Sequence, residues 1–314
     1  MIETLYNAKK RIVKAYHDYL TIDGTYTSWL PDKVYLKKLY KKRIGEELNL
    51  KNPETFNEKL QWLKLYDRNP EYTKMVDKYE ARDFVKAKIE RGGYKCSDIG
   101  LNFIPLLGVW GSVDEMDFEL LPNQFVLKCN HDNGVIICKD KSKLDIEKTK
   151  KDIEYHLHRN YYKKGREWPY KNVKRKIICE QFMQDCENDL LVDYKFFCYN
   201  GIPRCMYITQ HINGTEYINY FDSDFNPLDV RRKDLGSLPF ECFNKPICFE
   251  IMKEIAHQIT LGLSWVRCDL YQINGKVFFG ELTFFPTGGF APYVSKEWEL
   301  QFGEWLELPK KKRR

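Results

Sequence analysis

The chain has 314 residues, 43% of them hydrophobic and 31% charged, and its formal net charge is +6. This composition is typical of a globular protein, and the length predicts about two domains. The longest uninterrupted apolar stretches, such as residues 134–138, are much shorter than the ~20 residues that a membrane-spanning helix needs, so a transmembrane protein is excluded.

The net charge comes from the two ends of the chain. Residues 1–51 contain 11 Lys or Arg and 6 Asp or Glu, and residues 310–314 are all basic. Residues 52–309 therefore carry a net charge of −4. Two short basic segments on an acidic body argue against a broad nucleic-acid-binding surface, so we expect no nucleic acid partner. The N-terminus lacks the pattern of a secretory signal, which predicts a cytoplasmic protein.

The first 90 residues predict helices, and the rest of the chain predicts mostly strands. Helices are expected at 3–20 and 33–48, after Thr55 with Glu58 at the capping-box position, and at 70–89 with an end at Gly92-Gly93. Short β-branched and aromatic runs predict strands at 124–128, 135–138, 177–182, 194–199, 204–209, 217–221, 265–273 and 276–282. Helices at 145–162 and 247–261 interrupt them. Because the strands occur as adjacent pairs, we predict an α+β fold with largely antiparallel sheets.

The common phosphate-binding loops are absent, since the chain contains neither Gly-x-x-x-x-Gly-Lys-Ser/Thr nor Gly-x-Gly-x-x-Gly. The last strand pair offers another arrangement. Alternation places Arg267 and Asp269 on one face of the first strand, and Glu281 and Thr283 on one face of the second. A magnesium ion bridging to nucleotide phosphates would compensate the two carboxylates. The same face could equally be the solvent-facing side of an antiparallel sheet.

The turn between these strands gives a geometric test. A two-residue turn at Asn274-Gly275 would set Asp269 opposite Gly280 and leave Glu281 on the other face. A shared metal ion requires Asp269 opposite Glu281. We therefore predict a three-residue connection or a β-bulge near Gly275 or Gly280.

These residues also match a family pattern. Arg267-x-Asp269 followed by residues 280–290, Gly-Glu-Leu-Thr-x-x-Pro-x-x-Gly-Phe, resembles the metal-binding end of ATP-grasp enzymes. Residues 55–62, Asp77-Lys78-Tyr79-x-x-Arg82, and residues 125–134, 177–182 and 193–197 precede it in an order similar to the teichuronopeptide-biosynthesis (TupA-like) ATP-grasp proteins of bacterial surface-polysaccharide clusters. The resemblance covers about residues 51–300.

The resemblance implies an ATP-grasp fold, in which two largely antiparallel sheets with flanking helices grip the nucleotide. It implies five segments: a basic helical extension at 1–50, a helical region at 51–120, a small subdomain at 121–183, a C-terminal subdomain with the metal site at 184–305, and a basic tail at 306–314.

The resemblance also implies ATP and Mg²⁺ as cofactors and assigns site residues. Arg267 and Lys195 would act on the transferred phosphoryl group, and the metal ligands would be Asp269, Glu281 and Thr283. Many ATP-grasp enzymes have Asn where this chain has Thr283, which leaves the third ligand and a second metal ion open.

The remaining nucleotide-binding positions are Lys128, Asn130, His131, Gly134, Glu180, Gln181, Phe182, Met183 and Asp193. Asn130 to Gly134 would be a flexible loop over the phosphates, with Gly134 allowing its backbone conformation. Glu180 to Met183 would be an adenine-binding hinge, although a plain buried strand fits the same residues.

The implied reaction is ATP-dependent ligation of a carboxylate to an amine through an acyl phosphate. The implied substrates are an amino acid and a uronic acid or similar carboxylate of bacterial surface polysaccharide. A metal-dependent glycosyltransferase using Asp222-x-Asp224 is an alternative, although this segment also fits a connecting turn. A non-catalytic nucleotide-binding scaffold is a third hypothesis.

The basic N-terminal segment, with Lys9, Lys10, Arg11 and Lys14, has two interpretations. It could contact the inner membrane surface, or it could be the solvated face of a helix packed on the core.

Overall fold

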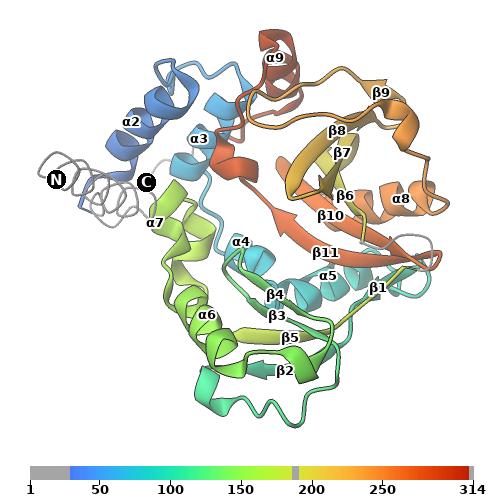
Figure 1. Cartoon of the computed structure of the whole chain (residues 1–314). Coiled ribbons are helices and arrows are strands. Elements are labelled where there is room, and N and C mark those ends of the chain that lie inside the picture. Colours follow the sequence, from blue (N-terminus) through green and yellow to red (C-terminus); the bar gives the residue numbers. More distant parts are fainter. Residues whose placement is uncertain (1–28, 186–190, 311–314) are drawn as a thin grey trace, which may run out of the picture.

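A computed structural model describes residues 29–185 and 191–310, which form two sheets surrounded by helices (Figure 1). The helices are α2 (Asp32–Ile44), α3 (Phe56–Tyr66), α4 (Glu71–Val76), α5 (Glu80–Arg91), α6 (Ile146–His158), α7 (Tyr161–Gly165), α8 (Phe249–Thr260) and α9 (Lys296–Trp305). The strands are β1 (Leu101–Phe103), β2 (Leu106–Trp110), β3 (Phe125–Cys129), β4 (Val135–Cys138), β5 (Ile177–Gln181), β6 (Asp193–Tyr199), β7 (Ile202–Ile212), β8 (Thr215–Asp222), β9 (Pro227–Leu228), β10 (Trp265–Ile273) and β11 (Lys276–Thr283).

The two sheets differ in size and lie one above the other in Figure 1. The larger has seven strands in the order β1-β11-β10-β6-β7-β8-β9, and only β1 runs parallel to its neighbour. The smaller has four antiparallel strands in the order β2-β5-β3-β4. The predicted α+β class with two largely antiparallel sheets is confirmed. β2 belongs to the smaller sheet although it precedes residue 121, and the five-segment division of the chain stays a prediction.

Each sheet has its own hydrophobic core. In the smaller sheet, Phe125 and Leu127 of β3 pack with Ile153 and Leu157 of α6. The larger sheet packs on α8 through residues such as Met252, and it also carries a cluster of aromatic rings. The two cores bury apolar surface separately, which leaves the space between the sheets available for polar side chains.

The start of α3 is confirmed as predicted. The Thr55 hydroxyl accepts a hydrogen bond from the Glu58 N–H at 3.3 Å, and the Glu58 carboxylate accepts one from the Thr55 N–H at 3.1 Å. This reciprocal pair satisfies two N–H groups that the first turn of a helix leaves unpaired.

The single helix predicted at 70–89 is wrong, because the chain forms α4 and α5 with a break at Asp77. Asp77 has an extended backbone, and its carboxylate accepts hydrogen bonds from the Tyr79 and Glu80 N–H groups at the start of α5. The same carboxylate accepts one from Asn130 Nδ2 at 2.8 Å. A contact with a distant loop therefore stabilises the break.

The single helix predicted at 145–162 is also wrong, since α6 ends at His158 and α7 begins at Tyr161. Arg159 lies between them with φ −61° and ψ 137°. This extended conformation allows its carbonyl to accept a hydrogen bond from His131 and its guanidinium to bind Asp132. The sequence analysis also did not predict β1, β2, β9 or α9.

The predicted β-bulge is confirmed at Gly280. Asn274 and Gly275 form a two-residue turn with φ of 49° and 70°, and Ile273 pairs with Lys276. The register then shifts by one residue, so that Asp269 pairs with Glu281 and Gly280 is the extra residue. The register that a shared metal ion would require is therefore present, and the metal site itself stays a prediction.

The predicted helix at 3–20 with its basic segment lies outside the described residues, and so do residues 311–314 of the predicted basic tail at 306–314. Within residues 29–185 and 191–310, no helix combines the length and apolar character that crossing a bilayer requires.

Replacing Gly280 with Ala should weaken the bulge. A Cβ at this position would lie 2.8 Å from the backbone carbonyl oxygen of Asp269, which cannot move without disturbing the ladder. We expect the free energy of unfolding in urea to fall by about 1–3 kcal/mol. Gly111→Ala is the control, because its Cβ would first meet the flexible end of the Glu115 side chain at 3.3 Å. Equal stability of the two variants would contradict a tightly packed bulge.

Candidate active site

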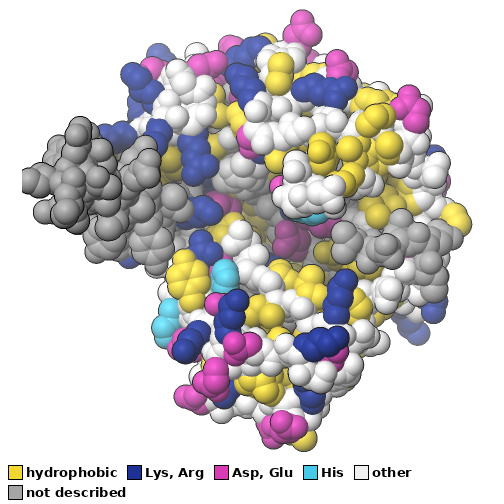
Figure 2. Space-filling model, in the orientation of Figure 1, with side chains coloured by type: hydrophobic (Ala, Val, Ile, Leu, Met, Phe, Trp, Pro, Cys, Tyr) yellow, Lys and Arg dark blue, Asp and Glu magenta, His cyan; other side chains and the backbone are white. Residues whose placement is uncertain are grey.

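Two adjoining cavities lie between the two sheets. The hairpin cavity, of about 320 Å³, is bordered by Arg267 and Glu281 of the β10–β11 hairpin. The hinge cavity, of about 520 Å³, is bordered by residues 180–183 at the end of β5. Lys128 and Asp193 are among the residues that line both, so the cavities form one cleft. Figure 2 shows the surface hollowed between the two sheets, with acidic side chains visible inside the hollow.

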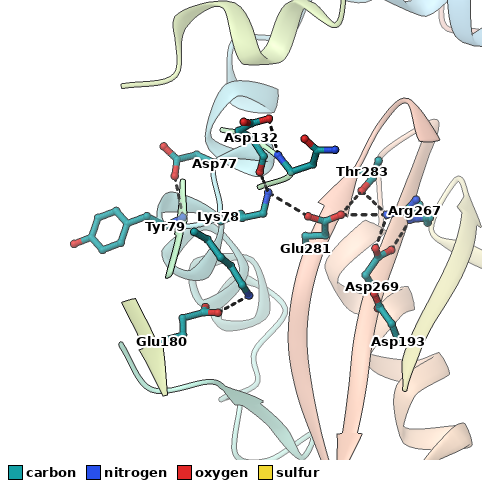
Figure 3. Close-up of polar contacts among 12 residues, drawn as sticks. Asp77, Lys78, Tyr79, Asp132, Glu180, Asp193, Arg267, Asp269, Glu281 and Thr283 are labelled. Atoms are coloured by element: carbon teal, nitrogen blue, oxygen red, sulfur yellow. Dashed lines mark hydrogen bonds and ion pairs between the residues drawn. The ribbon is translucent and has the colours of Figure 1, made fainter. Parts of the chain in front are cut away.

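An ion cluster occupies the floor of the hairpin cavity (Figure 3). Arg267 Nη2 lies 2.5 Å from Asp269 Oδ2, 2.9 Å from Thr283 Oγ1 and 3.2 Å from Glu281 Oε1. Asp269 also lies opposite Lys195 of β6, whose Nζ is 3.2 Å from Asp269 Oδ2. Three neighbouring strands thus place the predicted catalytic and metal-binding side chains together.

These groups stabilise one another in their charged forms. Burial alone would lower the pKa of Lys195, but the carboxylates of Asp193 and Asp269 raise it well above its usual value. Burial would likewise raise the pKa of Glu281, and the positive charges of Lys78 and Arg267 instead lower it to about 2. Lys195 and Glu281 are therefore both charged at neutral pH, as a site that binds charged groups requires.

Lys78 connects the two sides of the cleft, a role that sequence reasoning missed. It lies in the break between α4 and α5, and its Nζ is 3.5 Å from Glu281 Oε2 and 2.8 Å from the Asp132 carbonyl oxygen. Its backbone N–H also donates to the Asn130 carbonyl. In Figure 3, Lys78 and Arg267 approach Glu281 from opposite sides. The motif Asp77-Lys78-Tyr79 was the only sequence signal for this residue.

Lys128, predicted as a phosphate contact, lies on β3 and forms an ion pair with Glu180 at 2.6 Å. Arg82 of α5 approaches the other oxygen of Glu180 at 3.4 Å. Glu180, predicted in the hinge, thus neutralises two cations. Sequence reasoning did not assign Arg82 a role.

The loop at 130–134 is held by many hydrogen bonds. Asn130 Nδ2 donates to Asp77 and to the Lys174 carbonyl, both at 2.8 Å. His131 and Asp132 are buried as well, and His131, Asp132 and Asn133 line the hairpin cavity. The loop is therefore correctly placed beside the ion cluster, and its contact with phosphates stays a prediction.

The reason given for Gly134 is corrected by the structure. Its φ is not in the left-handed region, so a special backbone conformation does not require glycine. Instead, a Cβ at Gly134 would lie 2.3 Å from the imidazole ring of His156. Close approach of this ring, which is hydrogen-bonded to Asp132, excludes a side chain.

The predicted hinge residues Gln181, Phe182 and Met183 line the hinge cavity. The Gln181 N–H donates to the Pro105 carbonyl at 2.9 Å. Asp193 borders both cavities and hydrogen-bonds Lys195, and its buried Oδ1 has no hydrogen-bond partner among the described residues. Asp193 therefore has one unpaired hydrogen-bond acceptor, Oδ1, where the two cavities adjoin.

The motif Asp222-x-Asp224, the alternative metal site, stabilises a turn. The Asp222 carboxylate accepts hydrogen bonds from the N–H groups of Asp224 and Asn226 at 2.8 Å each, after the end of β8. Asp224 lies 3.6 Å from Lys253, and neither aspartate lines the cleft. These contacts favour the turn interpretation of this segment.

Comparison with known families agrees with this arrangement. The model of the TupA-like ATPgrasp family matches residues 58–307, most of the chain. The chain belongs to this family of ATP-grasp ligases. The match includes every predicted site residue, from Lys128 on β3 to Thr283 on β11. No curated protein matches the sequence significantly.

Solved structures of ATP-grasp ligases are only distantly similar. D-alanine–D-alanine ligase from Bacillus anthracis in complex with ATP has 12% identity and a TM-score of 0.36 over 67% of this chain and 53% of that chain. The Helicobacter pylori enzyme has 16% identity and a TM-score of 0.37 over 75% and 61%. An L-amino acid ligase from Bacillus licheniformis has 14% identity and a TM-score of 0.34 over 68% and 42%. The chain thus spans about half of the length of these proteins, and the family assignment rests on the sequence match alone.

Within the TupA-like chain, His131 should make the loop at 130–134 sensitive to pH. Burial of the ring lowers its pKa below 6.5, and the hydrogen bond from its Nε2 to the Arg159 carbonyl, at 3.1 Å, opposes this shift only in part. Its contribution to stability is complete above pH 6.5 and is lost as the pH falls below that value. We expect the free energy of unfolding of the wild type to decrease between pH 7.5 and 5, and His131→Gln to show a smaller decrease.

The control for this experiment is His158→Gln, because His158 is exposed at the end of α6. It should follow the wild-type dependence on pH. If the free energy of unfolding in urea depends on pH in the same way in His131→Gln and in the wild type, the buried neutral histidine does not cause the pH dependence.

Proposed function

We propose that the chain is an ATP- and Mg²⁺-dependent ligase that activates a carboxylate as an acyl phosphate and joins it to an amine. The observation that supports this most strongly is the convergence of Lys195, Arg267, Asp269 and Glu281 in one cleft between the two sheets. Their order along the chain is that of the ATP-grasp pattern, and the cleft has room for a nucleotide beside a second substrate.

The residues present fit a divalent cation. Asp269, Glu281 and Thr283 each place an oxygen within 3.2 Å of one point, which the Arg267 Nη2 occupies. These oxygens already stabilise one positive charge, and oxygens are the ligands that Mg²⁺ prefers, so Mg²⁺ would bind beside the Arg267 guanidinium and not in its place. Among the described residues, no group of three or more His, Cys, Asp or Glu side chains could hold a metal ion, so phosphate oxygens or water would have to complete the coordination. When bound, Mg²⁺ would supply positive charge that neutralises phosphate oxygens.

The cleft also fits ATP. The half-buried Phe182 and Met183 offer apolar contact to a base in the hinge cavity, and the backbone of this segment lies beside them. The unpaired oxygen of Asp193 could accept a hydrogen bond from a ribose hydroxyl at the junction of the cavities. Lys128 would then direct its charge to the phosphates from β3.

The charges of the cleft suit phosphoryl transfer. The transferred group spreads negative charge over its oxygens, and fixed positive charges stabilise it in a cavity with little water. Lys195 and Arg267 are held in fixed positions by Asp269, so their charges are oriented before the substrate binds. Lys78 would add a third cation from the opposite wall of the hairpin cavity.

For the substrates, we infer an amino acid and a uronic acid or a similar carboxylate of bacterial surface polysaccharide. This inference rests on the TupA-like family match. The test is a screen in which glucuronic and galacturonic acid are combined with single amino acids, ATP and Mg²⁺. We expect ADP release that depends on both substrates, and a product whose mass equals an amide of the two. Consumption of a nucleotide sugar without ADP release would favour the glycosyltransferase alternative.

Asp269→Asn should reduce the turnover of the active pair on the order of 100-fold or more, because the site loses a carboxylate that orients two cations. Asp224→Asn is the matched control, since Asp224 is exposed and lies outside the cleft. Circular dichroism and thermal unfolding would show that both variants keep the fold. If Asp269→Asn retains full turnover, or if Asp224→Asn loses it, the assignment of the site is wrong.

A further inference from the structure

One wall of the hairpin cavity carries a buried carboxylate that the proposed reaction has not used. Glu167 lies between α7 and a short 3₁₀ helix at Trp168–Asn172, and the residue is 5% exposed. It lines the hairpin cavity together with Tyr161, Tyr170 and Thr287. No motif in the sequence marked this segment.

The Glu167 carboxylate makes no hydrogen bond or ion pair with any other described residue, which sets it apart from the other buried acids. Asp132 binds His156 and Arg159, and Asp269 binds Arg267 and Lys195. An unpaired buried carboxylate is costly, and burial raises the pKa of Glu167 accordingly. The fold maintains an acceptor that faces the cavity and receives no donor from the described chain.

The nearest buried cation, Lys64, lowers the pKa of Glu167 through its charge but makes no hydrogen bond or ion pair with the carboxylate. Lys64 of α3 is 0% exposed, and its ammonium donates to Gln61 Oε1 at 3.0 Å, to the Gly165 carbonyl at 2.7 Å and to the Gly288 carbonyl at 2.6 Å. An ammonium group has three N–H donors, and these three oxygens use them all. Lys64 therefore fixes the backbone on both sides of Glu167 without binding its carboxylate.

Two tyrosines complete this end of the cavity. The rings of Tyr161 and Tyr170 lie 4.7 Å apart, and neither hydroxyl hydrogen-bonds another residue in the described parts of the chain. Both tyrosines line the cavity together with Glu167, whose negative charge raises the pKa of Tyr161 and contributes to raising that of Tyr170. An acceptor and two polar hydroxyls on an aromatic wall form a small polar subsite.

We propose that Glu167 binds the amino group of the amine substrate, with Tyr161 and Tyr170 forming the wall of this subsite. The proposal rests on the ligase function above and names a residue that recognises its second substrate. A carboxylate or phosphate would be repelled by Glu167, whereas the cations Lys78, Lys195 and Arg267 attract those groups to the ion cluster. An amine held by Glu167 lies in the same cavity as the ion cluster, where the acyl phosphate would form.

The cavity also limits the size of this substrate. A hairpin cavity of about 320 Å³ must hold the terminal phosphate, the reacting carboxylate and the amine together. The subsite therefore suits a small primary amine, such as an amino acid or an amino sugar.

The experiment uses Glu167→Gln, which removes the charge and keeps the shape. Glucuronic acid and Mg-ATP are held constant while L-alanine, L-glutamate and glucosamine are titrated in turn. We expect the KM for the amine to rise on the order of 10- to 100-fold, the loss of one charge-assisted hydrogen bond. The KM values for ATP and glucuronic acid should stay within about twofold of the wild type, because Glu167 contacts neither in the proposal.

A second readout separates amine binding from activation. Hydroxylamine attacks an acyl phosphate directly, forming a hydroxamate and releasing phosphate, and it needs no amine subsite. Hydroxamate formation from glucuronic acid and ATP should therefore be equal in the wild type and in Glu167→Gln. Glu147→Gln is the matched control, because Glu147 is exposed on α6, and it should leave every parameter unchanged.

The outcomes distinguish the two proposals. If the wild type forms neither hydroxamate nor ADP, the ligase function fails and the amine subsite with it. If the wild type is active and Glu167→Gln leaves the amine KM unchanged, or raises the KM for glucuronic acid instead, the subsite is wrong and the ligase function stands. Should Glu167→Gln not fold, Tyr161→Phe decides in its place, because an unchanged amine KM in that variant would equally overturn the subsite.

Discussion

The position of Asp269 opposite both Glu281 and Lys195 is the constraint on which the cleft depends. Side chains in neighbouring strands share a face only when they lie in register, and a shift of one residue moves a side chain to the other face. β6 and β10 pair without irregularity, which sets Lys195 beside Asp269. On the other side, the two-residue turn would place Glu281 on the wrong face, and the extra residue Gly280 restores it. One glycine thus determines whether the acids and cations of the hairpin cavity meet.

A few contacts that cross between the two sheets attach the loop at 130–134 to the ion cluster. Lys78 binds the loop after β3 and the Glu281 carboxylate at once, and Asp77 beside it holds Asn130. The break between α4 and α5 is therefore not a defect in a longer helix. It lets the Asp77 carboxylate accept hydrogen bonds from the N–H groups of Tyr79 and Glu80 at the start of α5, while Lys78 beside it reaches Glu281. The ion cluster and the loop at 130–134 keep their relative positions through this short segment.

Features that follow from local rules were predictable from the sequence. The bounds of β10 follow from its alternating residues, the start of α3 from Thr55 and Glu58, and the bulge at Gly280 from counting residues across a turn. The two helix breaks were not predictable in this way. Asp77 and Arg159 look like ordinary helix residues, and their extended backbones are stabilised by the loop at 130–134, which is distant in sequence. Helix α9 had a local signal, the Ser295 cap, that the sequence analysis did not use.

Among the site residues too, those placed by strand register were predictable and those placed by distant contacts were not. Lys195, Arg267, Asp269, Glu281 and Thr283 lie on strands whose register the sequence determines, and the structure brings them together. Lys78, Arg82 and Glu167 come from helix ends and connections, where spacing carries no information about which wall of the cleft they face. For Gly134, sequence reasoning gave the right residue type and the wrong cause, because the ring of His156 comes from a separate helix.

The distribution of charge along the chain says little about the chemistry, whereas its distribution within the cleft says more. In the hairpin cavity, Lys78 and Arg267 bind Glu281 from two sides, and Glu167, which also lines the cavity, has no ion-pair partner among the described residues. Such a separation would sort substrates by charge, since phosphate and carboxylate groups move toward the cations and an amine toward the acid. A reaction between an activated carboxylate and an amine requires both groups to bind in one small space at the same time, each in its own subsite. Opposite charges lining one cavity would provide that arrangement, and the hydrogen bonds from Lys64 to the Gly165 and Gly288 carbonyls hold the backbone near Glu167 in place.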